Sequence, residues 1–256
     1  MDNSMVPRFL VAVILLLLVG CSQSELLQKF ASPEEQSLAK GYVDLLRQQK
    51  FDDIEKEIDA SIGGASLHDT LVQMGALIPN GEPTSVKLVG AHRMNMDNST
   101  TVNLTFEYEF SGKWLLANVA VKKQGGKNII MGFNITPQSA SLEEQNKFTL
   151  NGKTTIQYIV FTLAIIFPLL TLYALVICVR TKLKGKKWPW VLFLIFGFGK
   201  FAVNWTTGQW AFAPLSFQLS SASATAPLFG QWTLGVSLPF GAVIFLLLRK
   251  KLRVPA

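Results

Sequence analysis

The sequence predicts an α+β domain, in which helices pack on a four-stranded antiparallel sheet, followed by an all-α region of three membrane-spanning helices. Four segments between residues 85 and 136 are rich in alternating or β-branched apolar residues and are joined by short turns, which is typical of an antiparallel meander. Three long apolar runs follow after residue 155, and the first and third end in clusters of Lys and Arg. That combination indicates helices that cross a membrane.

The N-terminus resembles the signal peptide of a bacterial lipoprotein. An apolar run at residues 9–19 follows Arg8, and it is too short to cross a bilayer, which takes about 20 residues. The run leads into Leu-Val-Gly-Cys at residues 18–21, which is similar to a lipobox. The resemblance implies a signal peptide over residues 1–21 and lipid attachment at Cys21. The alternative is an ordinary signal peptide that is cut elsewhere, with Cys21 incidental.

Three helices are expected at the start of the domain that follows. Ser32 is a helix cap, Pro33 suits the first helical position, and Glu35 can reach back to the cap, so a helix begins here and runs to about Gln49. Further helices are expected over residues 52–61, ended by two glycines, and over residues 67–77.

Four strands are expected next, over residues 85–94, 101–110, 114–122 and 127–136, the last stopping at Pro137. The second is the clearest, because apolar and polar residues alternate along it and predict one buried and one hydrated face. The apolar residues of this strand are Val102, Leu104, Phe106, Tyr108 and Phe110.

The order of these elements resembles the NTF2-like (cystatin-like) domains of small bacterial envelope proteins. Segments 41–46, 51–54, 112–114 and 132–137 carry the resemblance, which covers roughly residues 30–137 by pattern and without a sharp motif. Such domains include enzymes, ligand-binding proteins and assembly modules, so the resemblance implies a fold and leaves the function open. It implies an extracytoplasmic domain at residues 22–137, which a linker at 138–155 joins to the membrane region 156–256.

The charges of the chain are divided between its two parts. Residues 22–155 carry 13 basic and 16 acidic residues, whereas residues 156–256 carry 10 basic residues and no acidic one. The expected spans are 156–179, 188–203 and 228–248, and the positive-inside rule places the basic clusters after the first and third in the cytoplasm. The lipobox places residues 22–155 outside. The sequence thus predicts a bacterial inner-membrane protein with membrane lipid as a partner, and the basic excess does not indicate nucleic acid.

Lys200 is the unusual residue of the second expected span. If that span is a helix that starts at Trp188, Lys200 lies about 18 Å into a hydrocarbon core of about 30 Å. A cation at such a depth is a functional hypothesis. The alternative is that its long stem reaches the outer headgroups beside Asn204, and we favour it because no expected span contains Asp or Glu.

No catalytic or cofactor motif stands out in the sequence. His68 begins a predicted helix and His92 lies on a predicted strand, and neither has an evident nucleophile or metal partner. No metal site or cofactor is expected, and the prediction is a non-catalytic binding or assembly module with an envelope protein as partner. The alternative is an accessory subunit or enzyme that uses the NTF2-like cone as a small-molecule pocket, which would need a deep cavity with convergent titratable groups. A channel or carrier is disfavoured by the small number of spans and their lack of acidic residues.

Overall fold

A computed structural model describes residues 27, 30–59, 61, 62, 64–96 and 99–254 of the chain. The chain divides into two compact units, Met1–Ser141 and Leu142–Ala256, each with its own contacts. The predicted signal peptide and Cys21 lie outside the described residues.

Among the described residues of unit 1, the helix that the capping motif predicts starts directly after Ser32. The Ser32 hydroxyl accepts a hydrogen bond from the Glu35 backbone N–H, and the Glu35 carboxylate accepts one from the Ser32 N–H at 2.9 Å. This reciprocal cap satisfies two donors that a helix start leaves without intrahelical partners. The described residues of unit 1 contain helices α3 (Pro33–Arg47), α4 (Phe51–Glu55) and α5 (Leu67–Leu77).

The expected helix over residues 52–61 is wrong in its second half. Helix α4 ends at Glu55, and Ile58 forms a parallel bridge with Ile130 on the sheet. The N–H of Asp59 donates to the carbonyl of Ile130 at 2.9 Å, and the Ile130 N–H donates to the carbonyl of Glu57 at 2.7 Å. The backbone of this segment is therefore bonded to the last strand and is not available for further helical turns.

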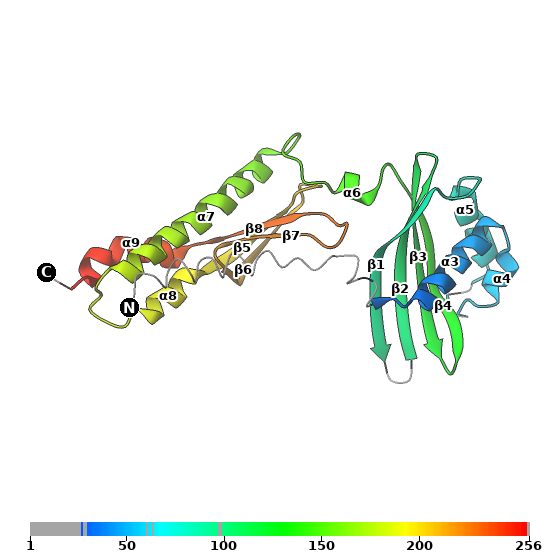
Figure 1. The fold of residues 1–256 in the computed structure, drawn as a ribbon, viewed down its shortest axis with the longest axis horizontal. Coiled ribbons are helices and arrows are strands. Elements are labelled where there is room, and N and C mark those ends of the chain that lie inside the picture. The colour runs from blue at the N-terminus through cyan, green and yellow to red at the C-terminus, as the bar shows by residue number, and fades with distance from the viewer. Residues whose placement is uncertain (1–26, 28–29, 60, 63, 97–98, 255–256) are drawn as a thin grey trace. The chain divides into compact units, whose positions relative to one another are not determined.

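The four predicted strands form one antiparallel meander, as expected. Figure 1 shows α3, α4 and α5 on one face of this sheet. The sheet order is β1-β2-β3-β4, and the strands are β1 (Ser85–Met96), β2 (Ser99–Phe110), β3 (Lys113–Gln124) and β4 (Lys127–Gln138). Strand β4 continues through Pro137, which pairs with Leu115. Proline is tolerated there because β4 is an edge strand. The turn expected at Asp97 and Asn98 lies outside the described residues.

The core of unit 1 lies between the sheet and the helices. The alternating apolar residues predicted for β2 are all buried there, with at most 4% of each exposed. Phe106 is fully buried, and the ring of Tyr108 stacks on that of Phe110 with centroids 6.2 Å apart. Trp114 pairs with Glu109 and so lies on the opposite face, where it is half-buried.

Unit 2 consists of helices around a second, smaller antiparallel sheet. Helix α7 agrees with the first predicted span and is the one helix among the described residues that is long and apolar enough to cross a membrane. The sheet order is β6-β5-β8-β7. The elements are α6 (Leu142–Gln145), α7 (Thr155–Arg180), α8 (Trp188–Ile195), β5 (Phe196–Asn204), β6 (Trp210–Leu219), β7 (Ala222–Thr225), β8 (Thr233–Leu238) and α9 (Phe240–Leu252).

The expected three-helix membrane region is therefore wrong at residues 188–203 and 228–248. The first of these segments is helical only to Ile195 and continues as β5. The second is strand β8 up to Leu238 and becomes helix α9 only after Pro239. The first change lies at Phe196, where β5 begins to pair with β6, and Gly199, with φ of +66°, sits at a bulge within that strand. Proline explains the second, because it suits a helix start and not a helix interior.

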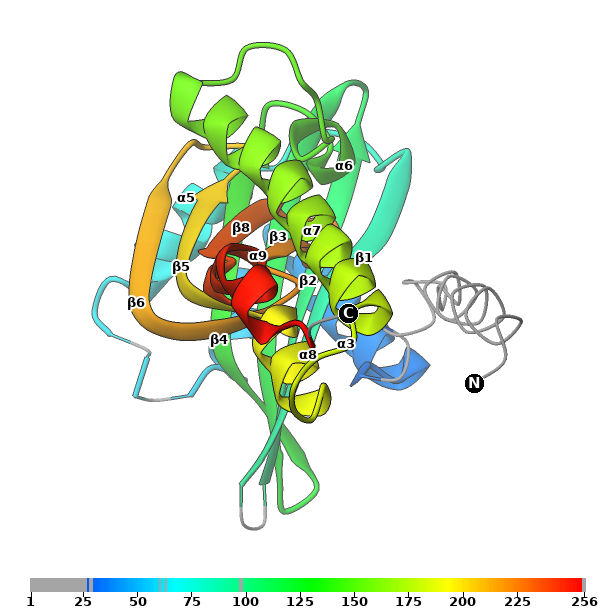
Figure 2. The same ribbon diagram turned by 90° about the vertical axis from the view of Figure 1, so that its left-hand side faces the viewer.

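These two composite segments nevertheless run beside α7 over its full length. A helix of 26 residues is about 39 Å long, and the eight helical and nine extended residues of α8 and β5 together reach about 40 Å. At one end, the Gln157 side chain donates to the carbonyl of Trp205 at 2.7 Å. At the other end, the Lys184 N–H donates to the carbonyl of Leu252 at 2.9 Å. Figure 2 shows α7 crossing in front of the sheet of unit 2.

Candidate functional site

The interior of unit 1 is filled by side chains. A cavity between α3 and the sheet measures about 10 Å³ and is lined by Glu35, Leu38, Val102, Leu104, Val121 and Lys123. Pockets that hold small molecules measure roughly 300–1,000 Å³, so this cavity is far smaller than such a pocket.

A buried carboxylate on α3 forms ion pairs with two residues of the sheet. Glu35 is 7% exposed, and its carboxylate lies 2.5 Å from Arg93 Nη2 on β1 and 3.7 Å from Lys123 Nζ on β3. Burial favours the neutral acid, but the hydrogen bond from the Ser32 backbone and the two nearby cations outweigh it. They hold the pKa of the Glu35 carboxyl below its ordinary value. Every contact of this group is thus structural.

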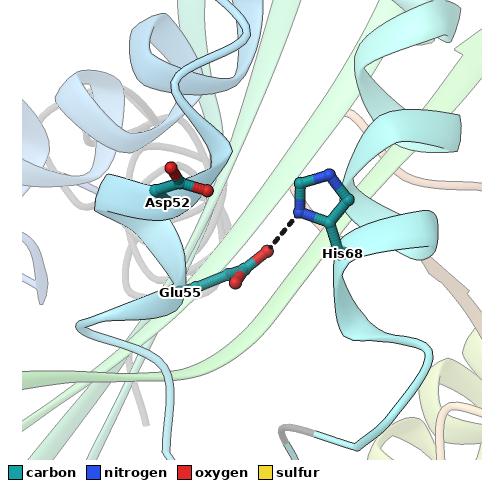
Figure 3. Close-up of side chains that lie close together, drawn as sticks. All are labelled: Asp52, Glu55 and His68. Carbon is teal, nitrogen blue, oxygen red and sulfur yellow. Dashed lines mark hydrogen bonds and ion pairs between the residues drawn. The ribbon is translucent and has the colours of Figure 1, made fainter.

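His68 lies in a cluster that the sequence analysis did not find. Figure 3 shows the ring of His68, on α5, pointing toward the carboxylate of Glu55, on α4, with Asp52 on the same helix. His68 Nδ1 is 2.8 Å from Glu55 Oε1, and one ligand atom from each of the three residues lies within 4.8 Å of the others. Imidazole and carboxylate are ligands that zinc accepts. The hydrogen bond accounts for the approach of His68 and Glu55, and the His68 side chain is 55% exposed.

Other titratable groups described in unit 1 lie on α3 and β1. His92 is exposed on β1, opposite Asn103. The Tyr42 hydroxyl donates to the Glu57 carboxylate, and burial together with this carboxylate raises the pKa of Tyr42. A polar hollow of about 270 Å³ lies at the C-terminal end of α3, where Arg47 is paired with Glu82 at 2.7 Å.

Unit 2 contains an apolar groove between α7 and one face of its sheet. The groove has a volume of about 640 Å³, which lies within the range of ligand-binding pockets. Several lining side chains are open to the surroundings, among them Ile159 at 53% and Phe212 at 61% exposure. The lining residues are Ile156, Ile159, Val160, Leu163 and Phe167 of α7, together with Phe198, Gly199, Phe201, Trp210, Phe212, Pro214, Val236, Ser237, Leu238 and Phe240.

Lys200 lies on strand β5 and not in a membrane helix, so the depth expected from a helical span is wrong. A methyl group built on Gly235 would lie 2.8 Å from Lys200 Cε, which places the lysine stem over β8. The Gln218 amide donates to the carbonyl of Gly235 at 3.3 Å and accepts from the Ser237 hydroxyl at 2.7 Å. Lys200 therefore adjoins a small polar network on the sheet and is half-buried.

An aromatic cluster surrounds the start of α7. Phe148 stacks on Trp205 with ring centroids 4.9 Å apart, and the Trp205 indole donates to the carbonyl of Thr149 at 2.8 Å. Lys153 Nζ lies 5.6 Å from the centre of the Trp205 ring, close enough for a cation–π contact. Trp205 is 1% exposed, so this cluster is packed inside unit 2.

Comparisons with known proteins identify no relative: no family model, no curated protein and no solved structure matches this chain. The function therefore has to be argued from the two units themselves.

The structure does not bring the sequence-predicted site residues together into one site. His68 and His92 belong to unit 1 and lie on α5 and β1, Lys200 belongs to unit 2, and Cys21 lies outside the described residues. The groove was missed because its lining comes from elements that are far apart in the sequence. Residues 210–219 form strand β6, but its position beside α7 depends on tertiary structure.

Proposed function

We propose that this protein is a lipoprotein of the bacterial inner membrane. In this proposal its extracytoplasmic NTF2-like domain, residues 22–137, is a non-catalytic binding or assembly module for an envelope protein. Acylated Cys21 and helix α7 hold the domain at the outer surface of the membrane. No cofactor takes part.

The closed interior of unit 1 is the observation that carries this proposal. Catalysis on a small molecule requires a pocket in which polar groups converge. The cavity between α3 and the sheet is about 10 Å³, and the aromatic residues of β2 are buried in the core between the sheet and the helices. A domain with a filled interior can still bind a macromolecule with its surface.

The ends of unit 2 support the membrane part of the proposal. Leu183 forms an antiparallel bridge with Arg253, and the Val254 N–H donates to the carbonyl of Lys182 at 2.9 Å. The two basic segments, 180–187 and 249–253, therefore meet at one end of the unit. The aromatic cluster lies at the start of α7, at the opposite end of that helix. The positive-inside rule favours a cytoplasmic position for the basic end.

A double histidine variant tests the non-catalytic function. In cells that lack the parent gene, we expect a chain with His68→Ala and His92→Ala to restore the parental phenotype, because neither side chain lies in a substrate pocket. Abundance and melting temperature are measured in parallel. A variant that is folded and abundant but fails to restore the phenotype would contradict the proposal and favour the alternative, an enzyme or accessory subunit.

Lipid attachment is tested separately by metabolic labelling with a fatty acid. The label should be present on the parent chain and absent from Cys21→Ala, whose precursor should accumulate. The variant should stay in the membrane fraction, because α7 remains as an anchor. Equal acylation and processing of the two chains would show that the N-terminus is not a lipobox.

A further inference from the structure

We propose that the groove of unit 2 binds one acyl chain of a phospholipid from the outer leaflet. This inference rests on the membrane-spanning position of α7 in the proposed function. It adds a specific ligand and a site that the function of the outer domain does not require.

The lining of the groove selects a ligand without polar groups. All but two of the lining side chains are aliphatic, aromatic or proline, the exceptions being Gly199 and Ser237. The Ser237 hydroxyl already donates to the Gln218 side chain at 2.7 Å, so it is not available as a donor to a ligand. A molecule with hydrogen-bonding groups would lose its hydration here without compensation, whereas a hydrocarbon chain would not.

The length of the groove matches one leaflet of a bilayer. The α7 residues in its wall extend from Ile156 to Phe167, a distance of about 16 Å along a helix. The hydrocarbon core is about 30 Å thick, so one leaflet contributes about 15 Å. The groove begins in the first turn of α7 and ends near the middle of the helix, as a chain that descends from the headgroup region requires.

The groove is also open to lipid and has a basic residue near its start. Several apolar side chains of α7 are exposed, among them Ile165, Leu169 and Leu172. Trp210, in the wall of the groove, is 60% exposed. Lys153 precedes α7 directly before its cap at Thr154, at the level where a phosphate group would lie. An acyl chain from the surrounding lipid can therefore enter from the side.

The test compares two tryptophan substitutions on α7 in the full-length chain. Ile159 lines the groove and is 53% exposed, whereas Ile166 is 49% exposed on the same helix and is not part of the lining. Parent, Ile159→Trp and Ile166→Trp chains are extracted into detergent, and the phospholipid that each retains is counted by native mass spectrometry and phosphorus analysis. We expect about one phospholipid per chain in the parent and in Ile166→Trp, and at least a fivefold loss in Ile159→Trp at an unchanged melting temperature.

Other occupants give different results in the same experiment. Equal retention by all three chains, or no retention by the parent, would overturn the proposal. A Cys21→Ala chain is measured in the same way. If it retains phospholipid and the parent does not, the lipid on Cys21 fills the groove in the parent, which overturns a phospholipid occupant. A dimer that Ile159→Trp converts to a monomer would assign the groove to a second copy of the chain.

A carbonate wash separates this inference from the proposed function. If the Cys21→Ala chain leaves the membrane on washing, α7 does not span it and the proposed function fails. If the chain stays in the membrane but retains no phospholipid, the groove inference alone fails.

Discussion

Glu35 is a side chain whose burial and charge together affect the stability of unit 1. It closes the cap of α3 and pairs with Arg93 on β1, so one carboxylate joins the first helix to the sheet. Its carboxylate accepts from the Ser32 backbone N–H and pairs with the side chains of Arg93 and Lys123. We therefore assign it to structure and not to catalysis.

The stability of unit 1 should depend on the charge of this carboxylate. Because its pKa is lowered from 4.5 on folding, the ionised form stabilises the native state. That stabilisation is complete above the unfolded-state value and is lost as the pH falls through the folded-state value. Calorimetric melting of the full chain in micelles should show a lower melting temperature for Glu35→Gln at pH 7 and a smaller difference below pH 4. A difference that grows on acidification would contradict this assignment.

The two faces of the sheet of unit 1 differ in how much a single aromatic residue contributes to the stability of the unit. Phe106 is fully buried against the helices, and Phe106→Ala should destabilise unit 1 by about 3–5 kcal/mol. Trp114 is half-buried on the opposite face, so Trp114→Ala should cost less than about 2 kcal/mol. Chemical denaturation of both variants measures the difference. Equal losses would contradict the assignment of the faces.

At the scale of elements, the contact between α8 and α9 depends on one glycine. Gly241, in the first turn of α9, is packed so closely that an added methyl group would overlap with the carbonyl oxygen of Phe193 on α8. Backbone atoms cannot move aside as a flexible side chain can. The two helices approach one another only because this position has no side chain.

We expect Gly241→Ala to destabilise unit 2 by about 1–3 kcal/mol, the usual cost of overpacking. Gly185→Ala is the matched control, because no atom lies within 4 Å of the methyl group that it adds. It should change the stability by less than about 0.5 kcal/mol. Thermal melting of both variants in micelles is the measurement. If the two substitutions behave alike, α8 and α9 do not pack as described.

At the scale of the whole molecule, the proposed topology can be tested with single cysteines. In a chain with Cys178→Ser, we expect Lys127→Cys to react with an impermeant thiol reagent in intact cells whose outer membrane, where present, is permeabilised. Lys184→Cys should react only after lysis, because it belongs to the basic segment placed in the cytoplasm. Labelling at position 184 before lysis would reverse the orientation.

The sequence by itself predicted the α+β order of unit 1, the capped start of α3, the bounds of α5 and the buried face of β2. Each of these depends on neighbours a few residues apart: a cap and its third residue, or a strand with period two. It also predicted α7 from its uninterrupted apolar run. Local sequence patterns were therefore sufficient for these elements.

Only the tertiary structure decided the other elements of unit 2 and the packing inside unit 1. Residues 188–203 and 228–248 are apolar enough for helices, but pairing of β5 with β6 and β8 satisfies their backbone groups as strands. The closed interior of unit 1, the cluster at His68 and the groove beside α7 each require side chains from distant segments. Such sites depend on packing between elements, which a local pattern in one sequence does not contain.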